Sequence, residues 1–257
     1  MKLLKKAARK LWVTPKPLGR QGEEQTASKL GWVSIWGYKG KLLRNVYVPM
    51  GNGGTTEIDL LYITQKGIFV LESKNYAGYI YGNEWSQNWM ETLYAGKTWL
   101  GRNKVEKHRF YNPIWQNRTH MRALERYLGS PIQMISVIVF SERCTLREIA
   151  YDSPDVVVCH QDELLKNIRR VWRTLPDTLS WAQIDHIHSA LRPLTDPDRA
   201  TKRQHVQDIK EYKSAPSYTC PWCGGELVLR TAKNGPHAGQ QFYGCANYPQ
   251  CRYIRDL

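Results

Sequence analysis

The chain has 257 residues and a formal net charge of +14, because 37 lysines and arginines stand against 23 aspartates and glutamates. This charge favours a polyanionic partner, with nucleic acid first and an anionic membrane surface second. The longest apolar run covers only residues 135–140 and is interrupted by Ser136, which excludes a membrane-spanning helix of ~18 apolar residues and thus an integral membrane protein.

The first 17 residues predict a basic arm, which carries six lysines and arginines and no acid. Its leucines and alanines recur at helical spacing, so a short amphipathic helix could form there and contact a membrane surface or phosphates. A frayed, solvated tail is the other interpretation. The arm lacks the apolar core of a secretory signal, so we expect a cytoplasmic protein.

Residues 18–192 predict one α/β domain with a mostly buried central sheet, because helical and strand patterns are mixed along this stretch. The run 133–140 is almost wholly apolar, as in a strand that is buried on both faces. The apolar spacing in 112–128 is helical, and Gly129 follows as a stop signal. Further helices are expected at 21–30, 161–172 and 180–191, and further strands at 44–48, 57–64, 67–74 and 155–159.

Acidic residues and a lysine gather at the ends of two neighbouring strands. Glu57 and Asp59 open one strand, and Glu72 and Lys74 close the next. A two-residue loop at 65–66 places Asp59 across from Glu72, and Glu57 across from Lys74, at a distance of ~4.5–5.5 Å. Two carboxylates this close repel each other unless a cation lies between them. A divalent metal bound by the two carboxylates, with a lysine beside it, could support hydrolysis of a phosphodiester bond.

The register of this hairpin is open at the level of sequence. A three-residue loop with a left-handed Gly67 is the alternative, and it moves Asp59 and Glu72 to opposite faces unless a bulge restores them. In that case the same residues are ordinary surface charges.

Several motifs in the domain resemble a known family. Gly19-Arg-Gln-Gly-Glu23 comes first, Glu-Ile-Asp59 follows, then Glu72-Ser-Lys-Asn-Tyr-Ala-Gly78, and finally Asn112-Pro-Ile-Trp-Gln116. Their order over about residues 18–130 is similar to that of the nuclease-related domain (NERD) family, a branch of the restriction-endonuclease-like PD-(D/E)xK superfamily. The resemblance implies a mixed central sheet flanked by helices and, by analogy of fold, a metal-dependent nuclease.

The same resemblance implies roles for individual residues. Asp59 and Glu72 would be the principal ligands of a catalytic Mg2+ (or Mn2+). Lys74 would orient the attacking water or stabilise charge on the phosphate. Gln116 would be an outer polar contact, and Glu23, with Glu24 as the alternative, would be an accessory acid on the first helix.

The stretch 76–115 holds ten aromatic residues in forty positions, and several arginines and lysines lie within it or shortly after it. Cations near the catalytic residues suit a DNA channel, and aromatic rings there could stack on bases. Most of these rings are expected to be core or sheet covering instead. His108 and His120 are interpreted as surface residues rather than general bases.

Residues 193–217 predict a polar linker, and residues 218–257 predict a small metal-bound unit. Cys220 and Cys223 form one close pair, and after 21 residues Cys245 and Cys251 form another. Two such pairs complete a tetrahedral site for a structural Zn2+. A redox role of the first pair is the alternative, but the second pair and the lack of a βαβ pattern argue against it.

This unit resembles the zinc ribbons of bacterial type IA topoisomerases, in its Cys-Pro-x-Cys-Gly-Gly and Phe-Tyr-Gly-Cys-x-x-Tyr-Pro-x-Cys segments. Its aromatic rings and cations could form a stacking platform for single-stranded nucleic acid, or the rings could form the small core. That family's ribbons bind single-stranded DNA, which agrees with the platform. The binding residues are predicted to be Trp222, Arg230, Tyr243, Tyr248 and Arg252.

The sequence therefore predicts a metal-dependent deoxyribonuclease whose zinc ribbon binds single-stranded, duplex or branched DNA. The alternative is a catalytically inactive DNA-binding adaptor that keeps the nuclease fold, with DNA affinity unaffected by Mg2+ or by Lys74→Ala. A third hypothesis is a peripheral membrane protein that uses the N-terminal arm. Nucleases that cut both strands often act as pairs, so a homodimer is a further partner to test.

Overall fold

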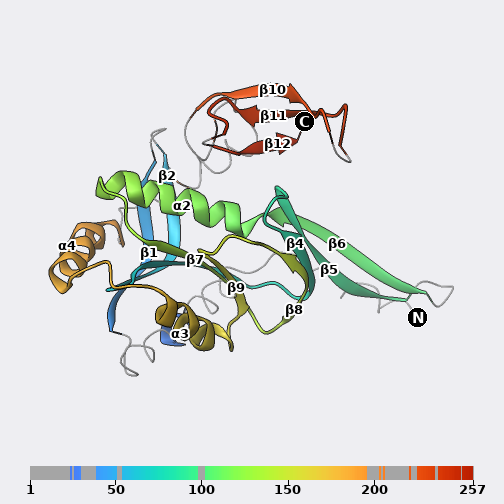
Figure 1. Ribbon diagram of the computed structural model, residues 1–257. Coiled ribbons are helices and arrows are strands. Elements are labelled where there is room, and N and C mark those ends of the chain that lie inside the picture. The colour runs from blue at the N-terminus through green and yellow to red at the C-terminus, as the bar shows by residue number, and fades with distance from the viewer. Residues whose placement is uncertain are drawn as a thin grey trace.

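The structure, a computed structural model, describes residues 24, 26–29, 39–50, 54–97, 102–195, 203, 205, 220, 225–234, 237–249 and 251–256. It has the mixed α/β architecture that the sequence predicts, with three sheets and flanking helices (Figure 1). Within these residues, no helix combines the length and apolar character needed to cross a membrane.

The main sheet has five strands in the order β1-β2-β3-β7-β9. β1 (Gly40–Pro49), β2 (Thr55–Thr64) and β3 (Gly67–Lys74) form an antiparallel meander. β7 (Met134–Phe140) and β9 (Val156–His160) then continue the sheet in parallel with β3. Every residue of β7 is buried, which confirms the prediction of a strand covered on both faces.

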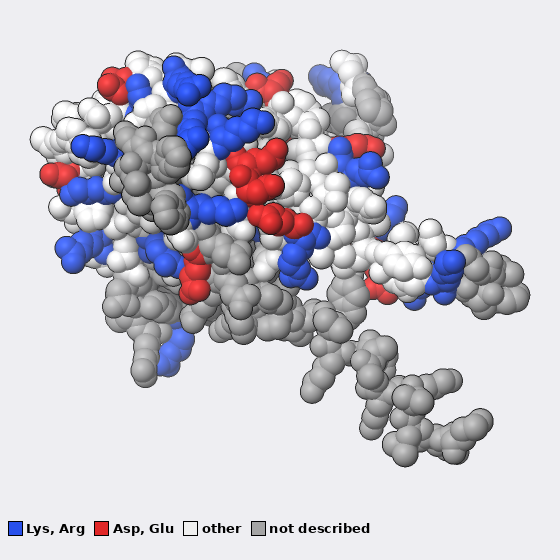
Figure 2. Space-filling model, turned by 90° about the horizontal axis from the view of Figure 1, so that it is seen from below, with Lys and Arg blue, Asp and Glu red and all other residues white. Residues whose placement is uncertain are grey.

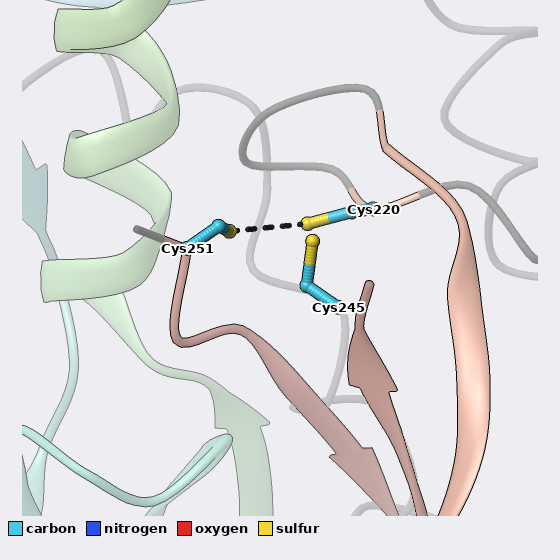
Figure 3. A group of neighbouring side chains, drawn as sticks. All are labelled: Cys220, Cys245 and Cys251. Atoms are coloured by element: carbon cyan, nitrogen blue, oxygen red, sulfur yellow. Dashed lines mark hydrogen bonds between the residues drawn. The ribbon is translucent and has the colours of Figure 1, made fainter. Parts of the chain in front are cut away.

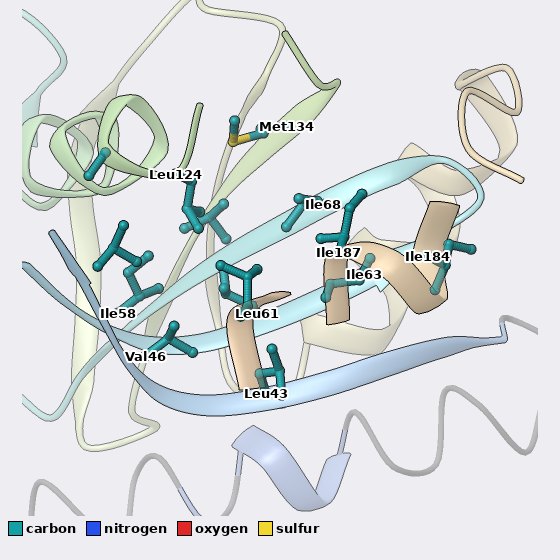
Figure 4. Packing of buried hydrophobic residues seen from close by; sticks show 14 of the residues in the cluster. Leu43, Val46, Ile58, Leu61, Ile63, Ile68, Leu124, Met134, Ile184 and Ile187 are labelled. Carbon is teal, nitrogen blue, oxygen red and sulfur yellow. The ribbon is translucent and has the colours of Figure 1, made fainter. Parts of the chain in front are cut away.

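Helices cover the two faces of the main sheet. α2 (Pro113–Leu128) and α4 (Trp181–Leu191) pack on one face, in a core cluster that includes Leu61, Leu124 and Ile184 (Figure 4). α3 (Leu164–Thr174) packs on the other face, where Leu164 and Ile168 meet the opposite side of the same strands. A short 3-10 helix, η1 (Arg192–Thr195), follows α4.

α2 begins and ends where the sequence places it. The side chain of Asn112 accepts a hydrogen bond from the Ile114 amide at 2.9 Å, and Pro113 occupies the first helical turn. Gly129 ends the helix with φ of 70°, a left-handed conformation in which a glycine is favoured. The Asn112 cap fixes the start of the helix, which matters because Gln116 lies in its first turn.

A second sheet, which the sequence analysis did not predict, has four strands in the order β6-β5-β4-β8. They are β4 (Gly78–Asn83), β5 (Asn88–Lys97), β6 (Asn103–Tyr111) and β8 (Cys144–Ala150). Its inner face packs Ile80 and Trp89 against Phe140 of β7 and Ile114 of α2. The hairpin of β5 and β6 extends away from the body of the protein (Figure 1).

The third sheet is a small antiparallel unit of β10 (Leu227–Thr231), β11 (Gln241–Cys245) and β12 (Ile254–Asp256). Its core contains three cysteines and Tyr253, and Trp115 of α2 packs into the same cluster. The rings of Trp115 and Tyr253 are 5.7 Å apart between centroids. The small unit therefore contacts the larger domain through the first turn of α2.

Candidate active site and zinc ribbon

The structure brings Glu72, Lys74 and Gln116 into one hydrogen-bonded cluster between β3 and α2. Lys74 Nζ donates to Glu72 Oε1 at 2.7 Å and to Gln116 Oε1 at 2.9 Å. Gln116 Nε2 donates to the same Glu72 oxygen at 2.7 Å. The cluster forms because Glu72 and Lys74 are two residues apart in a strand and point to the same face, which α2 covers.

The hairpin between β2 and β3 has the register of the two-residue loop. Leu60 pairs with Leu71, and the ladder continues in the same register as far as Thr64 and Gly67. The paired residues end one position before Asp59 and Glu72, and Asp59 reaches β3 with its side chain instead. Its Oδ2 accepts a hydrogen bond from the main-chain amide of Ser73 at 2.8 Å. Asp59 thus lies beside the strand segment that carries Glu72 and Lys74.

Glu57 lies in a different environment from the one that the register predicts. Its carboxylate is 3.8 Å from Nε2 of His205, a buried residue of the predicted linker. His205 Nδ1 is also 3.0 Å from the Thr55 hydroxyl. The expected pair of Glu57 with Lys74 is not among the paired residues of β2 and β3, which begin at Leu60 and Leu71, and Glu57 lies near His205 instead.

His120 is a member of the cluster that the sequence analysis assigned to the surface. It is only 3% exposed, and its Nε2 lies 3.1 Å from Glu72 Oε2. Its Nδ1 lies 2.7 Å from the hydroxyl of Thr56 on β2. The signal was present in the sequence, because His120 follows Gln116 by four residues and so lies on the same face of the helix.

The cluster keeps Glu72 ionised although its side chain is almost fully buried. Burial would raise the pKa of Glu72, but the charges and hydrogen bonds of Lys74 and His120 lower it to about 2. Burial alone would lower the pKa of Lys74, but Glu72, and more weakly Asp59, raise it above the ordinary lysine value. The site therefore holds a carboxylate and an ammonium group at neutral pH.

The donor set fits a hard divalent cation. Asp59 and Glu72 offer carboxylate oxygens, which are the ligands that Mg2+ and Mn2+ favour. Glu72 is ionised, so its oxygens can bind a cation without first losing a proton. Glu23, the expected accessory acid, lies outside the described residues, and its alternative Glu24 is an exposed helical residue.

Three of the four predicted zinc ligands lie together in the small sheet. The sulfurs of Cys220, Cys245 and Cys251 are all within 4.8 Å of one another, and all three residues are buried (Figure 3). Sγ of Cys220 and Sγ of Cys251 are 3.6 Å apart. Two thiolates bound tetrahedrally at ~2.3 Å from one zinc ion would lie about 3.8 Å apart, so the spacing fits. Cys223 lies outside the described residues.

The predicted nucleic-acid residues of the small sheet divide into exposed and packed side chains. Tyr248 is 60% exposed, and the guanidinium carbon of Arg230 is 6.0 Å from its ring centroid. Arg252 is exposed, whereas Tyr243 is half-buried with Arg255 at 5.0 Å from its ring. Trp222 lies outside the described residues. The described part thus presents two arginine–tyrosine pairs.

Comparisons with known proteins agree with both resemblances. Residues 18–141 match the family model of the nuclease-related domain, and residues 217–257 match that of the topoisomerase DNA binding C4 zinc finger. No solved structure matches the chain.

Two relatives cover different parts of the chain. An uncharacterized protein of Bacillus anthracis is 28% identical over 193 residues, which cover 75% of this chain and 84% of that protein. DNA topoisomerase 1 of Archaeoglobus fulgidus is 56% identical over 38 residues, which cover 15% of this chain and 5% of the topoisomerase. Residues 18–141 of the chain are therefore similar to the nuclease-related domain family, and residues 217–257 carry a topoisomerase-type zinc ribbon.

Proposed function

We propose that the protein is a metal-dependent nuclease that hydrolyses DNA phosphodiester bonds. The observation that supports this most is the cluster that Lys74 and Gln116 form around the buried Glu72, with Asp59 hydrogen-bonded to the adjoining strand. Glu72 is an ionised carboxylate with 3% exposure that contacts a lysine and lies beside the residue that binds Asp59, and such a combination suits metal-assisted hydrolysis. The nuclease-related family adds support by analogy of fold.

Each residue of the candidate active site would have its own role in this reaction. Asp59 and Glu72 would hold Mg2+, which when bound supplies Lewis-acid activation of a water and of the phosphate. The Lys74 ammonium would position the attacking water or offset the charge that develops on the phosphate oxygens. Gln116 would keep both groups in place, since its amide bridges Lys74 and Glu72. His120 would orient Glu72 from its other oxygen.

The zinc ribbon would hold the substrate near this site. Its structural Zn2+ would be bound by Cys220, Cys245 and Cys251, with Cys223 as the predicted fourth ligand. The matched family is described as DNA binding, and the exposed Tyr248 beside Arg230 suits single-stranded or branched DNA. The net charge of +14 would add attraction to any polyanion.

The test is cleavage of labelled single-stranded, duplex and forked DNA, with Mg2+, with Mn2+ and without added metal. A chelator is avoided because it would also strip zinc from the ribbon. Wild type is compared with Glu72→Gln and Lys74→Ala, and with Glu125→Gln as the control on an exposed carboxylate of α2. We expect metal-dependent cutting that falls at least ~100-fold in the two site variants and not in the control.

Two results would contradict the proposal. Equal cutting by wild type and Glu72→Gln would mean that the activity comes from elsewhere. DNA binding by all variants without cutting by any of them would favour the non-catalytic adaptor instead.

A further inference from the structure

The second sheet has one buried face and one exposed face. Side chains alternate along its strands, and Ile80, Trp89 and Phe110 point into the core that it shares with α2 and β7. Residues on the opposite face are unusually exposed for aromatic and apolar side chains. Tyr79 is 43% and Tyr94 is 63% exposed.

The strand register places cations beside these two tyrosines. Tyr79 of β4 pairs with Thr92 of β5, and Thr92 pairs with Lys107 of β6. Tyr94 follows Thr92 by two residues, so it is a diagonal neighbour of Tyr79 at about 7–8 Å. From β8, the guanidinium carbon of Arg147 lies 5.0 Å from the centre of the Tyr79 ring. Tyr79 thus has Arg147 on one side, and Thr92 and then Lys107 on the other, with Tyr94 diagonal to it.

The charge of this face is positive. Lys107 and Arg109 of β6 are both exposed and lie on the same face of the sheet as Arg147. They are two residues apart, so they point to the same side, and both pair with outward positions of β5. Glu148 of β8, which pairs with Tyr81, is the acid at the opposite edge of the same face. An anionic ligand on this face therefore meets more cations than acids among the described residues.

This face runs into the zinc ribbon. Tyr111 is the last residue of β6 and has the same parity as Lys107 and Arg109. It packs against the core of the ribbon, with its ring 6.3 Å from that of Trp115. The ribbon then repeats the same chemistry, since Arg255 lies 5.0 Å from the Tyr243 ring, as Arg147 does from Tyr79.

We infer that the sheet platform, defined as Tyr79, Tyr94, Lys107, Arg109 and Arg147, binds single-stranded nucleic acid as a continuation of the zinc ribbon. Unpaired bases stack on the two tyrosines, and phosphates bind the three cations. The faces of bases in a duplex are already stacked on one another, so the platform selects single strands. This role rests on the proposed nuclease function, in which the platform would guide a nucleic-acid strand toward the candidate active site. The experiment on the platform measures binding alone.

The experiment is fluorescence anisotropy of a labelled 15-nucleotide single strand with the full-length, zinc-loaded protein, without added Mg2+. Tyr79→Ala and Tyr94→Ala are each expected to weaken binding on the order of tenfold, whereas Tyr94→Phe keeps the ring and binds like wild type. Tyr127→Ala is the matched control, because Tyr127 of α2 is 41% exposed and lies outside the platform. Its affinity is expected to stay unchanged.

A second control separates the platform from general charge. α3 carries Lys166, Arg169, Arg170 and Arg173 on its solvent side, on the other face of the main sheet from α2. Figure 2 shows lysines and arginines gathered on the face that α3 covers in Figure 1. Lys107→Gln with Arg147→Gln is expected to reduce the slope of log affinity against log salt by about 0.7 per cation. Lys166→Gln with Arg170→Gln is expected to leave the slope unchanged.

Three outcomes would overturn the inference. Wild-type affinity in both Tyr79→Ala and Tyr94→Ala would exclude stacking on this face. Equal loss in the α3 pair would assign the binding to overall charge. A dimer in light scattering that Tyr94→Ala dissociates would assign the face to a second copy of the chain. Thr92→Glu, which places an acid at the centre of the platform, gives an independent variant and is expected to abolish binding.

The binding test also separates the two proposals. Loss of binding in the tyrosine variants together with no Mg2+-dependent cutting by wild type would refute the nuclease and keep the platform. Cutting that depends on Glu72, with binding indifferent to both tyrosines, would refute the platform and keep the nuclease.

Discussion

The carboxylate of Glu84 holds three segments of the domain together, and its removal gives a measurable loss of stability. Glu84 is 3% exposed and follows β4. Its Oε1 accepts hydrogen bonds from Arg118 of α2 and from the Ser153 hydroxyl. Its Oε2 accepts from the main-chain amides of Asp152 at 3.1 Å and Ser153 at 3.2 Å. In Glu84→Gln one oxygen becomes an NH2 group, so one of these two sets of donors loses its acceptor.

The expected loss is about 2–4 kcal/mol. A buried donor without an acceptor costs about 1–3 kcal/mol. Loss of the ion pair with Arg118 adds to this cost, but only in part, because the Arg118 side chain is 24% exposed and can turn toward water. Urea unfolding measures the difference, and Glu148→Gln on exposed β8 is the matched control, with a change expected within about 0.5 kcal/mol.

The pH dependence of this difference identifies its cause. Burial would raise the pKa of Glu84, but Ser153, the Asp152 amide and Arg118 lower it below the ordinary 4.5. A carboxylate with a lowered folded pKa stabilises the protein fully above the unfolded value, and this contribution is lost as the pH falls through the folded pKa. The gap between wild type and Glu84→Gln should therefore narrow from pH 7 to pH 3. A gap below 0.5 kcal/mol at pH 7, or one that does not narrow, would refute the reasoning.

Four further predictions follow from described contacts. His120→Ala removes the partner of Glu72 Oε2, so we expect the Mg2+ concentration for half-maximal cleavage to rise about 10- to 100-fold, and an unchanged midpoint would contradict the positioning role. Cys245→Ser is expected to lower the zinc content below one ion per chain. Amides of β10 and β11 should then lose their protection from hydrogen exchange, whereas amides of β7 should keep it. Retained zinc and retained protection would contradict a structural site. Asn45 has φ of 50°, so Asn45→Ala should cost about 1 kcal/mol in urea unfolding and Asn45→Gly should cost less, and an equal cost for both variants would contradict this conformational reason. Burial raises the pKa of Cys159 to about 12, so a thiol reagent at pH 8 should label it only after unfolding, and rapid labelling of the native protein would show that the thiol is accessible.

The elements that the sequence predicts well are those whose pattern is local. β3 has the predicted limits of residues 67–74, because its apolar run is bounded by a turn and by charged residues. α2 carries its own caps at Asn112 and Gly129, so its ends can be assigned from the sequence. The buried strand β7 is predicted by its composition alone. In each case the deciding residues lie within or next to the element.

The elements that the sequence does not predict depend on distant partners. β6 has the sequence NKVEKHRFY, which is largely charged and exposed, and it is a strand because it pairs with β5 at the edge of a sheet. His120 is buried only because β2 and β3 bring Thr56 and Glu72 to its two ring nitrogens. The hairpin register was open in the sequence, and the Leu60–Leu71 pairing decides it.

The first turn of α2 links the candidate catalytic cluster to the ribbon. Trp115 and Gln116 are consecutive, so their side chains leave the helix about 100° apart. Trp115 enters the ribbon core, whereas Gln116 bridges Lys74 and Glu72. The Trp115 indole also donates to the main-chain oxygen of Glu84 at 2.6 Å, which anchors the turn from the second sheet. A DNA strand bound to the ribbon would thus lie next to the helical turn that positions Gln116. The cations of α3, in contrast, lie on the other face of the main sheet from the ribbon and from the candidate catalytic cluster. This arrangement favours the ribbon and the second sheet over α3 as the route of a DNA strand to the site.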